Sequence, residues 1–174
     1  MHYRDGAKIM RQDQEWLIPK TKEGHLRFTK PLLTYWAVAL GYSMFGENSF
    51  GARVPGILTG CLSILLTYIL ACDVSRSKHV GFIAALMLAC VPVFFTSSIQ
   101  AKPDVYLTFC FLVSFAGFVR LIVLDQKVLG SFCMAYGGAA GAVMSKGLLG
   151  IGVVLFAWTF VFIQDRKSTR LNSS

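Results

Sequence analysis

Charge is scarce in the long apolar stretches of this 174-residue sequence. Lys, Arg, Asp and Glu make up 15% of the chain, whereas hydrophobic residues make up 55%. Charged residues stand mainly at the ends of five apolar runs, which are Val54–Cys72, Val80–Ile99, Val105–Leu124, Val128–Ser145 and Gly147–Ile163. Each run is close to the roughly 20 residues that an α-helix needs to cross about 30 Å of hydrocarbon. Because the runs are apolar on all sides, the shortage of charge excludes a soluble domain and predicts an all-α, polytopic membrane protein with about five spans.

Acidic residues and metal-binding motifs are also scarce. The chain has 9 Asp and Glu against 17 Lys and Arg, a net charge of +8, but the basic residues are scattered through loops without a stripe or a recognition motif. This pattern argues against nucleic acid as a partner and favours charges that orient helices beside lipid headgroups. The 3 histidines are far apart and none of the 5 cysteines forms a C-x-x-C pair, so no metal site is predicted. No cofactor is evident, and dependence on a divalent metal stays open.

The lysines and arginines between the runs predict the orientation of the chain in the membrane. Basic residues follow the first and fifth runs and bracket the end of the third, and they are Arg76, Lys78, Arg120, Lys127, Arg166, Lys167 and Arg170. Simple alternation places them on one side, which we assign to the cytoplasm. The segment 1–53, the turn Gln100–Asp104 and Lys146 then fall together on the outer face.

The segment 1–53 is too rich in aromatic and branched residues for a disordered linker. Pro31 fits the first turn of a helix, with Thr29 as a candidate N-cap. The helix Pro31–Phe45 is apolar but too short to span the membrane comfortably, so we predict an interfacial helix on the outer leaflet. Gly46 and the polar residues after it are expected to end this helix.

We therefore divide the chain into an extracytoplasmic loop with interfacial helices (1–53), a transmembrane bundle (54–163) and a cytoplasmic tail (164–174). The tail resembles translated adapter or vector sequence, and an ordinary basic tail is the alternative. Pro92 is expected to kink the second run, and Gly137 and Gly141 are expected to allow close helix packing. The tight turn at Lys146 leaves a broken or re-entrant pair as an alternative to two full crossings.

Short motifs in a fixed order carry a resemblance to a known family. They are Trp16–Pro19, Gly24–Trp36, Leu40–Gly46, Phe50–Pro55, Gln100–Asp104 and Met144–Gly147. Together they resemble the first outer loop and the following spans of bacterial lipid-carrier-dependent glycosyltransferases of the C-type superfamily. That superfamily includes the aminoarabinose transferase of lipid A and relatives of the protein O-mannosyltransferases.

The resemblance implies an enzyme that transfers a sugar, with inversion, from a polyprenyl-phosphate donor to lipid A, a protein or another glycan. It implies a multi-pass protein of the bacterial inner membrane whose active face is extracytoplasmic. Its partners would be the donor, a lipid or protein acceptor and the membrane lipids.

The resemblance also implies roles for five residues. Lys30 matches a lysine that binds the donor phosphate, and Lys146 is placed near the same phosphate. Asp104 matches a supporting catalytic carboxylate, and Tyr3 and His2 align with an Arg-Tyr pair that binds substrate, although His2 departs from the arginine. The residues alone leave simpler roles open, because Lys30 and Lys146 could be snorkelling lysines and Asp104 could be the N-cap of the helix Val105–Leu124.

The family's principal Asp-Glu pair would lie before Met1, so the sequence resembles an N-terminal-region fragment that is expected to be inactive alone. A transporter subunit and a membrane scaffold without chemistry are the alternative functions. The runs contain no Asp, Glu or Lys at mid-membrane positions, which favours a site at the membrane surface over a transport pathway. A scaffold predicts no special cost for replacing Lys30 or Asp104.

Overall fold

The computed structural model describes Lys8 and residues 32–100, 102–126, 128–152, 154–155, 158–159 and 162–163. Within these residues the chain forms helices and no strand, which confirms the predicted all-α class. The helices are α2 (Leu32–Phe45), α3 (Ser49–Ser75), α4 (Lys78–Cys90), α5 (Pro92–Ile99), α6 (Pro103–Ile122) and α7 (Leu129–Lys146). The candidate residues His2, Tyr3 and Lys30, together with the expected cap Thr29, lie outside the described residues.

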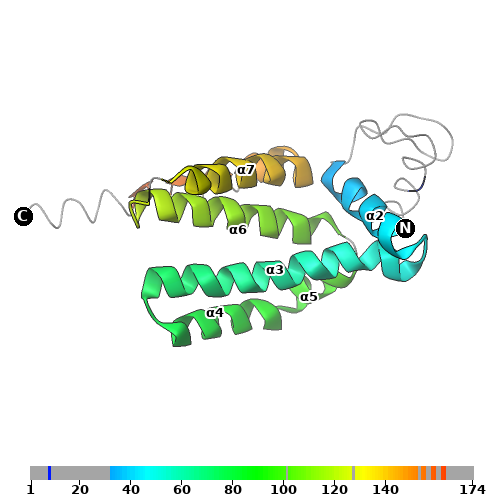
Figure 1. Ribbon diagram of the computed structural model, residues 1–174, viewed down its shortest axis with the longest axis horizontal. Helices are drawn as coiled ribbons and strands as arrows, with labels where there is room; N and C mark the ends of the chain where they lie inside the picture. Colours follow the sequence, from blue (N-terminus) through cyan, green and yellow to red (C-terminus); the bar gives the residue numbers. More distant parts are fainter. Residues whose placement is uncertain are drawn as a thin grey trace, which may run out of the picture.

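The helices form an elongated bundle with α2 lying across one end (Figure 1). Helices α3, α6 and α7 and the α4–α5 pair run along the long axis. At the end covered by α2, which we call the α2 end, α3 and α6 begin and α5 and α7 finish. At the far end, α3 and α6 finish and α4 and α7 begin.

The turn between α2 and α3 is built as its residues predict. Gly46 adopts a φ of +79° and ends α2, as the sequence indicated. Asn48 caps α3 by accepting a hydrogen bond from the Gly51 backbone N–H at 2.6 Å. Helix α3 therefore begins at Ser49, five residues before the predicted start at Val54, so the predicted boundary at residue 53 falls inside a helix. The prediction missed this start because Arg53 interrupts the apolar sequence just before Val54, and only the Asn48 cap marks the true start.

Two helices, α3 and α6, are long and apolar enough to cross a membrane. Helices α4 and α5 meet this criterion only together, and they are bent by 65° at the break. The predicted kink at Pro92 is thus confirmed, since proline removes a backbone hydrogen bond inside a helix. The described residues give two spans, or three if the bent pair counts as one, and the predicted total of five stays a prediction.

Helices α6 and α7 pack closely because small side chains face each other. The buried residues of α7 recur every three or four positions, and they are Ser131, Ala135, Gly138, Ala142 and Ser145. Ser114 donates a buried hydrogen bond across the interface to the Ala135 carbonyl at 2.8 Å. A Cβ at Gly138 would lie 2.4 Å from the Ser114 backbone nitrogen, whereas a Cβ at Gly137 would meet nothing within 4 Å. The predicted role in packing is therefore wrong for Gly137 and belongs to its neighbour Gly138.

Gly138→Ala is expected to lower the melting temperature of the protein in detergent, because the new methyl group overlaps the backbone of α6. Overpacking of this kind costs about 1–3 kcal/mol. Gly137→Ala is the matched control, and its gain in helix propensity over glycine is worth roughly 0.5–1 kcal/mol. Equal melting temperatures for the two variants would contradict this helix register.

Candidate functional site

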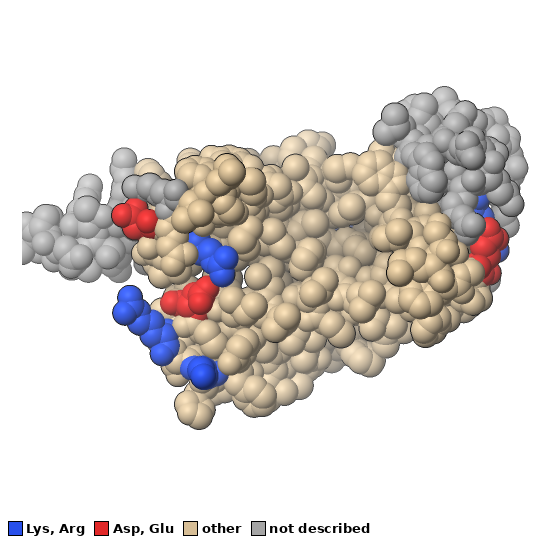
Figure 2. All heavy atoms as spheres, in the orientation of Figure 1, with Lys and Arg blue, Asp and Glu red and all other residues tan. Residues whose placement is uncertain are grey.

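The charged side chains of the described residues gather at the two ends of the bundle, and the face drawn in Figure 2 is uncharged between them. Those at the far end are Asp73, Arg76, Lys78, Arg120 and Asp125, and those at the α2 end are Lys8, Glu47, Arg53, Lys102, Asp104 and Lys146. This separation fits a bundle whose middle lies in hydrocarbon, where charge is costly. The turn before α6 and Lys146 were predicted to lie on the same side of the membrane, and both lie at the α2 end of the bundle.

Two of the predicted site residues form an ion pair at the α2 end. Lys146 Nζ lies 2.5 Å from Asp104 Oδ1, although the residues are 42 positions apart. Their side chains are 39% and 43% exposed, so the pair contributes about 0–1 kcal/mol to stability. A weak contribution to stability leaves both groups available for chemistry.

Helix ends place this pair where each charge is favoured. Pro103 occupies the first turn of α6, with Asp104 after it, and Lys146 stands in the last turn of α7. A carboxylate at a helix N-terminus and an ammonium at a C-terminus both interact favourably with the helix dipoles. The N-cap of α6 is Lys102, without a side-chain capping bond. The alternative role of Asp104 as the N-cap of this helix is thus excluded.

A second ion pair lies at the far end. Arg120 Nη2 lies 3.1 Å from Asp73 Oδ2, and the Arg120 guanidinium also donates to Met134 Sδ at 3.5 Å. These contacts tie the last turn of α6 to α3 and α7. The sequence predicted Arg120 near the cytoplasmic side of the membrane but did not predict its pairing with Asp73.

Asp104 also lines a small cavity of about 230 Å³ beside the break between α4 and α5. The hydroxyl-bearing residues Ser97 and Thr108 line it with Asp104, and Phe94 is among its apolar residues. The Thr108 hydroxyl donates to the Asp104 backbone carbonyl at 2.9 Å. The cavity combines one carboxylate, two hydroxyl-bearing residues and an aromatic ring, which are groups suited to a hydroxylated ligand.

The start of α2 lies beside the same turn of α6. Leu33 packs against the cluster formed by Phe94, Val105 and Tyr106, the last two of which directly follow Asp104. Lys30 stands two residues before the first residue of α2 in the sequence. Among the described residues, no three His, Cys, Asp or Glu side chains are grouped so that they could hold a metal ion.

Comparisons with known proteins agree on one family. Residues 29–174 match the model described as dolichyl-phosphate-mannose-protein mannosyltransferase. An uncharacterized protein of Aquifex aeolicus is 34% identical over 158 residues, which are 88% of this chain and 31% of that protein. An undecaprenyl phosphate-alpha-4-amino-4-deoxy-L-arabinose arabinosyl transferase of Pseudomonas aeruginosa is 32% identical over 139 residues, which are 75% of this chain and 25% of that protein.

A protein of the same description from Yersinia enterocolitica is 25% identical over 172 residues, 97% of this chain and 31% of its own length. The chain therefore spans between a quarter and a third of the length of these relatives. No solved structure matches it.

Proposed function

Since this chain belongs to the dolichyl-phosphate-mannose-protein mannosyltransferase family, we propose that it forms part of a membrane glycosyltransferase that uses a polyprenyl-phosphate sugar. The reaction site lies at the α2 end of the bundle, on the extracytoplasmic face of the bacterial inner membrane. The observation that carries the proposal is the Asp104–Lys146 pair, which joins a carboxylate and an ammonium from distant parts of the chain at the α2 end of the bundle.

The proposed reaction is a single displacement at the anomeric carbon. The acceptor oxygen or nitrogen attacks that carbon from the face opposite the phosphate, its proton passes to a carboxylate base, and the bond to phosphate breaks. The bonding electrons leave with the polyprenyl phosphate, so the configuration inverts. Such a step needs a base near the acceptor and cations that stabilise the charge on the leaving phosphate.

The residues of this chain supply part of that set. An ammonium has three N–H donors, so Lys146 can hold Asp104 and still bind a phosphate oxygen. Lys30 is the second phosphate-binding residue, Asp104 is the supporting carboxylate, and His2 and Tyr3 contact the substrate. The acceptor is lipid A, a protein or another glycan.

The test uses the full-length protein that contains this chain, purified in lipid nanodiscs. The protein is given undecaprenyl-phosphate donors that carry a radiolabelled sugar. The label is expected to move to an acceptor, and undecaprenyl phosphate is expected to be released. The Pseudomonas aeruginosa relative serves as the positive control for the assay. Transfer by the control, combined with none by this protein from any prenyl-phosphate sugar offered, would contradict the proposal.

A further inference from the structure

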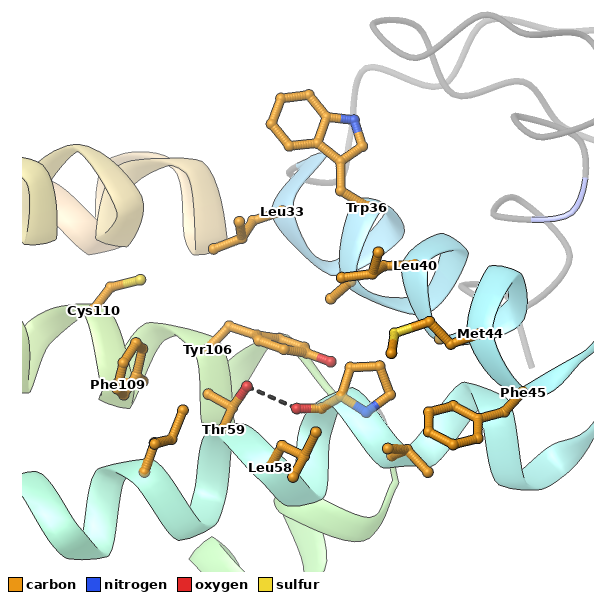
Figure 3. Close-up of a pocket in the computed structure, with 15 residues that line it drawn as sticks. Leu33, Trp36, Leu40, Met44, Phe45, Leu58, Thr59, Tyr106, Phe109 and Cys110 are labelled. Carbon is orange, nitrogen blue, oxygen red and sulfur yellow. Dashed lines mark hydrogen bonds between the residues drawn. The ribbon is translucent and has the colours of Figure 1, made fainter.

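Two cavities flank the first turns of α6. The larger one, of about 510 Å³, lies between α2, α3 and α6, and the described residues that line it are uncharged (Figure 3). The smaller one is the cavity of about 230 Å³ that Asp104 lines beside the break between α4 and α5, which we call the α5 cavity. None of the described residues lines both cavities. The α5 cavity is therefore a separate space, and it is the one that includes a residue of the candidate site.

Ser97 brings an unused hydroxyl to the α5 cavity. It stands in the last turn of α5 and is 4% exposed. Its neighbours Thr96 and Ser98 donate to carbonyls of their own helix, at 3.1 Å and 2.9 Å. The Ser97 hydroxyl makes no such bond to any residue that the structure describes. A buried hydroxyl without a partner is unfavourable, so a ligand in the cavity would satisfy it.

The break between α4 and α5 adds hydrogen-bond donors to the same cavity. The N-cap of α5 is Val91, whose side chain has no atom that could cap the helix. The first backbone N–H groups of a helix have no partner inside that helix, and here they include those of Val93 and Phe94, which line the cavity. The cavity thus combines N–H donors, the Asp104 acceptor and the Ser97 hydroxyl. Hydroxyl groups both donate and accept, so this mixture suits a ligand with several of them.

The volume and the position of the α5 cavity fit one sugar ring. The cavity is smaller than the pockets of about 300–1,000 Å³ that hold drug-sized ligands and far larger than the roughly 30 Å³ of a single water. Asp104 links the cavity to Lys146 through their ion pair. A sugar ring in the cavity therefore lies beside the ammonium that is proposed to bind the donor phosphate.

We propose that the α5 cavity holds the sugar ring of the donor and that Ser97 is a specificity-determining residue, which forms a hydrogen bond with one sugar hydroxyl. The inference rests on the proposed function and adds where the sugar is held and which residue distinguishes it from others. Asp104 accepts a hydrogen bond from a second hydroxyl, and the phosphate stays outside the cavity at Lys146.

A cysteine placed in the cavity tests occupancy without turnover. The full-length protein without its native cysteines carries Ser97→Cys, and in nanodiscs it is treated with a small methanethiosulfonate reagent. The probes are undecaprenyl phosphate carrying mannose or 4-amino-4-deoxy-L-arabinose, the sugars named for the family and for its relatives. At least one probe is expected to slow labelling tenfold or more, whereas undecaprenyl phosphate without a sugar should not.

Thr96→Cys is the matched control for labelling, because Thr96 stands on the same helix but is not among the described residues that line the cavity. Its labelling should not respond to any of the lipids. An unreactive Ser97→Cys in the absence of donor, or equal protection by undecaprenyl phosphate with and without a sugar, would overturn the inference.

Ser97→Ala separates recognition of the sugar from folding. It should lower kcat/KM by about twofold to tenfold, the usual effect of one lost hydrogen bond, and leave the melting temperature unchanged. Ser98→Ala removes a hydroxyl that is bonded inside α5, so its kcat/KM should equal that of the parent. Among donors that each lack one sugar hydroxyl, one should be transferred equally well by Ser97→Ala and by the parent.

Equal kcat/KM for Ser97→Ala and Ser98→Ala, or a loss in Ser97→Ala that is the same for every deoxy donor, would contradict the role of Ser97. If the full-length protein still transfers sugar in those cases, the proposed function stands without this cavity.

Discussion

Asp104→Asn in the full-length protein reduces sugar transfer by about 10²-fold or more while the amount of inserted protein stays unchanged. Loss of a group that supports proton transfer or a developing charge typically costs about 10²–10³-fold in rate. The same substitution breaks an ion pair whose partners are about two-fifths exposed, which costs about 0–1 kcal/mol of stability. A large loss of transfer rate with a small loss of stability would show that the Asp104 carboxylate acts in the reaction and not mainly in holding the fold together.

The controls separate the chemistry from the ion pair itself. The double variant Asp104→Lys with Lys146→Asp restores an ion pair with the charges exchanged, and it should remain as inactive as Asp104→Asn. Asp73→Asn removes the acidic partner of Arg120 in the pair at the far end, and transfer should be retained. A purely structural role of the Asp104–Lys146 pair would instead predict recovery in the exchanged double variant and equal effects at both ends.

Lys30→Ala is expected to reduce transfer by a similar factor, mainly because the leaving phosphate loses a cation. Lys30→Arg should restore only part of the rate, since a planar guanidinium does not replace a compact ammonium. The rate is measured with saturating donor and again at low donor concentration, so that binding and chemistry are separated.

Lys20→Ala is the matched control, because Lys20 belongs to the same segment 1–53 in the sequence and has no proposed role in binding the phosphate. Unchanged transfer by Lys30→Ala, or an equal loss in Lys20→Ala, would remove Lys30 from the site.

The features predicted correctly from the sequence depend on local chemistry. Pro92 predicts the break between α4 and α5 because the effect of proline is confined to its own helix turn, and the bend is 65°. Gly46 predicts the end of α2 for the same reason, since it adopts positive φ at the turn. The start of α3 was predicted too late, because Arg53 interrupts the apolar run while the helix itself begins four residues earlier, after the Asn48 cap.

Features that depend on helix rotation or on distant pairing were missed. Gly137 and Gly138 differ by about 100° around α7, and apolar runs contain no signal that selects one of them. Asp104 and Lys146 were each predicted as site residues, but their contact was not predicted because it depends on how α6 packs against α7. The Asp73–Arg120 pair likewise depends on how α3 packs against α6, which no single segment specifies.

The central claim is that Lys30, Asp104 and Lys146 share the extracytoplasmic surface. It is tested most directly by cysteine labelling in intact cells, with a variant that lacks the five native cysteines and carries one new cysteine at a time. A membrane-impermeant maleimide is expected to label positions 30, 104 and 146 from outside, and to reach position 78 only after the membrane is opened. Labelling of position 30 and position 104 from opposite sides would contradict the account.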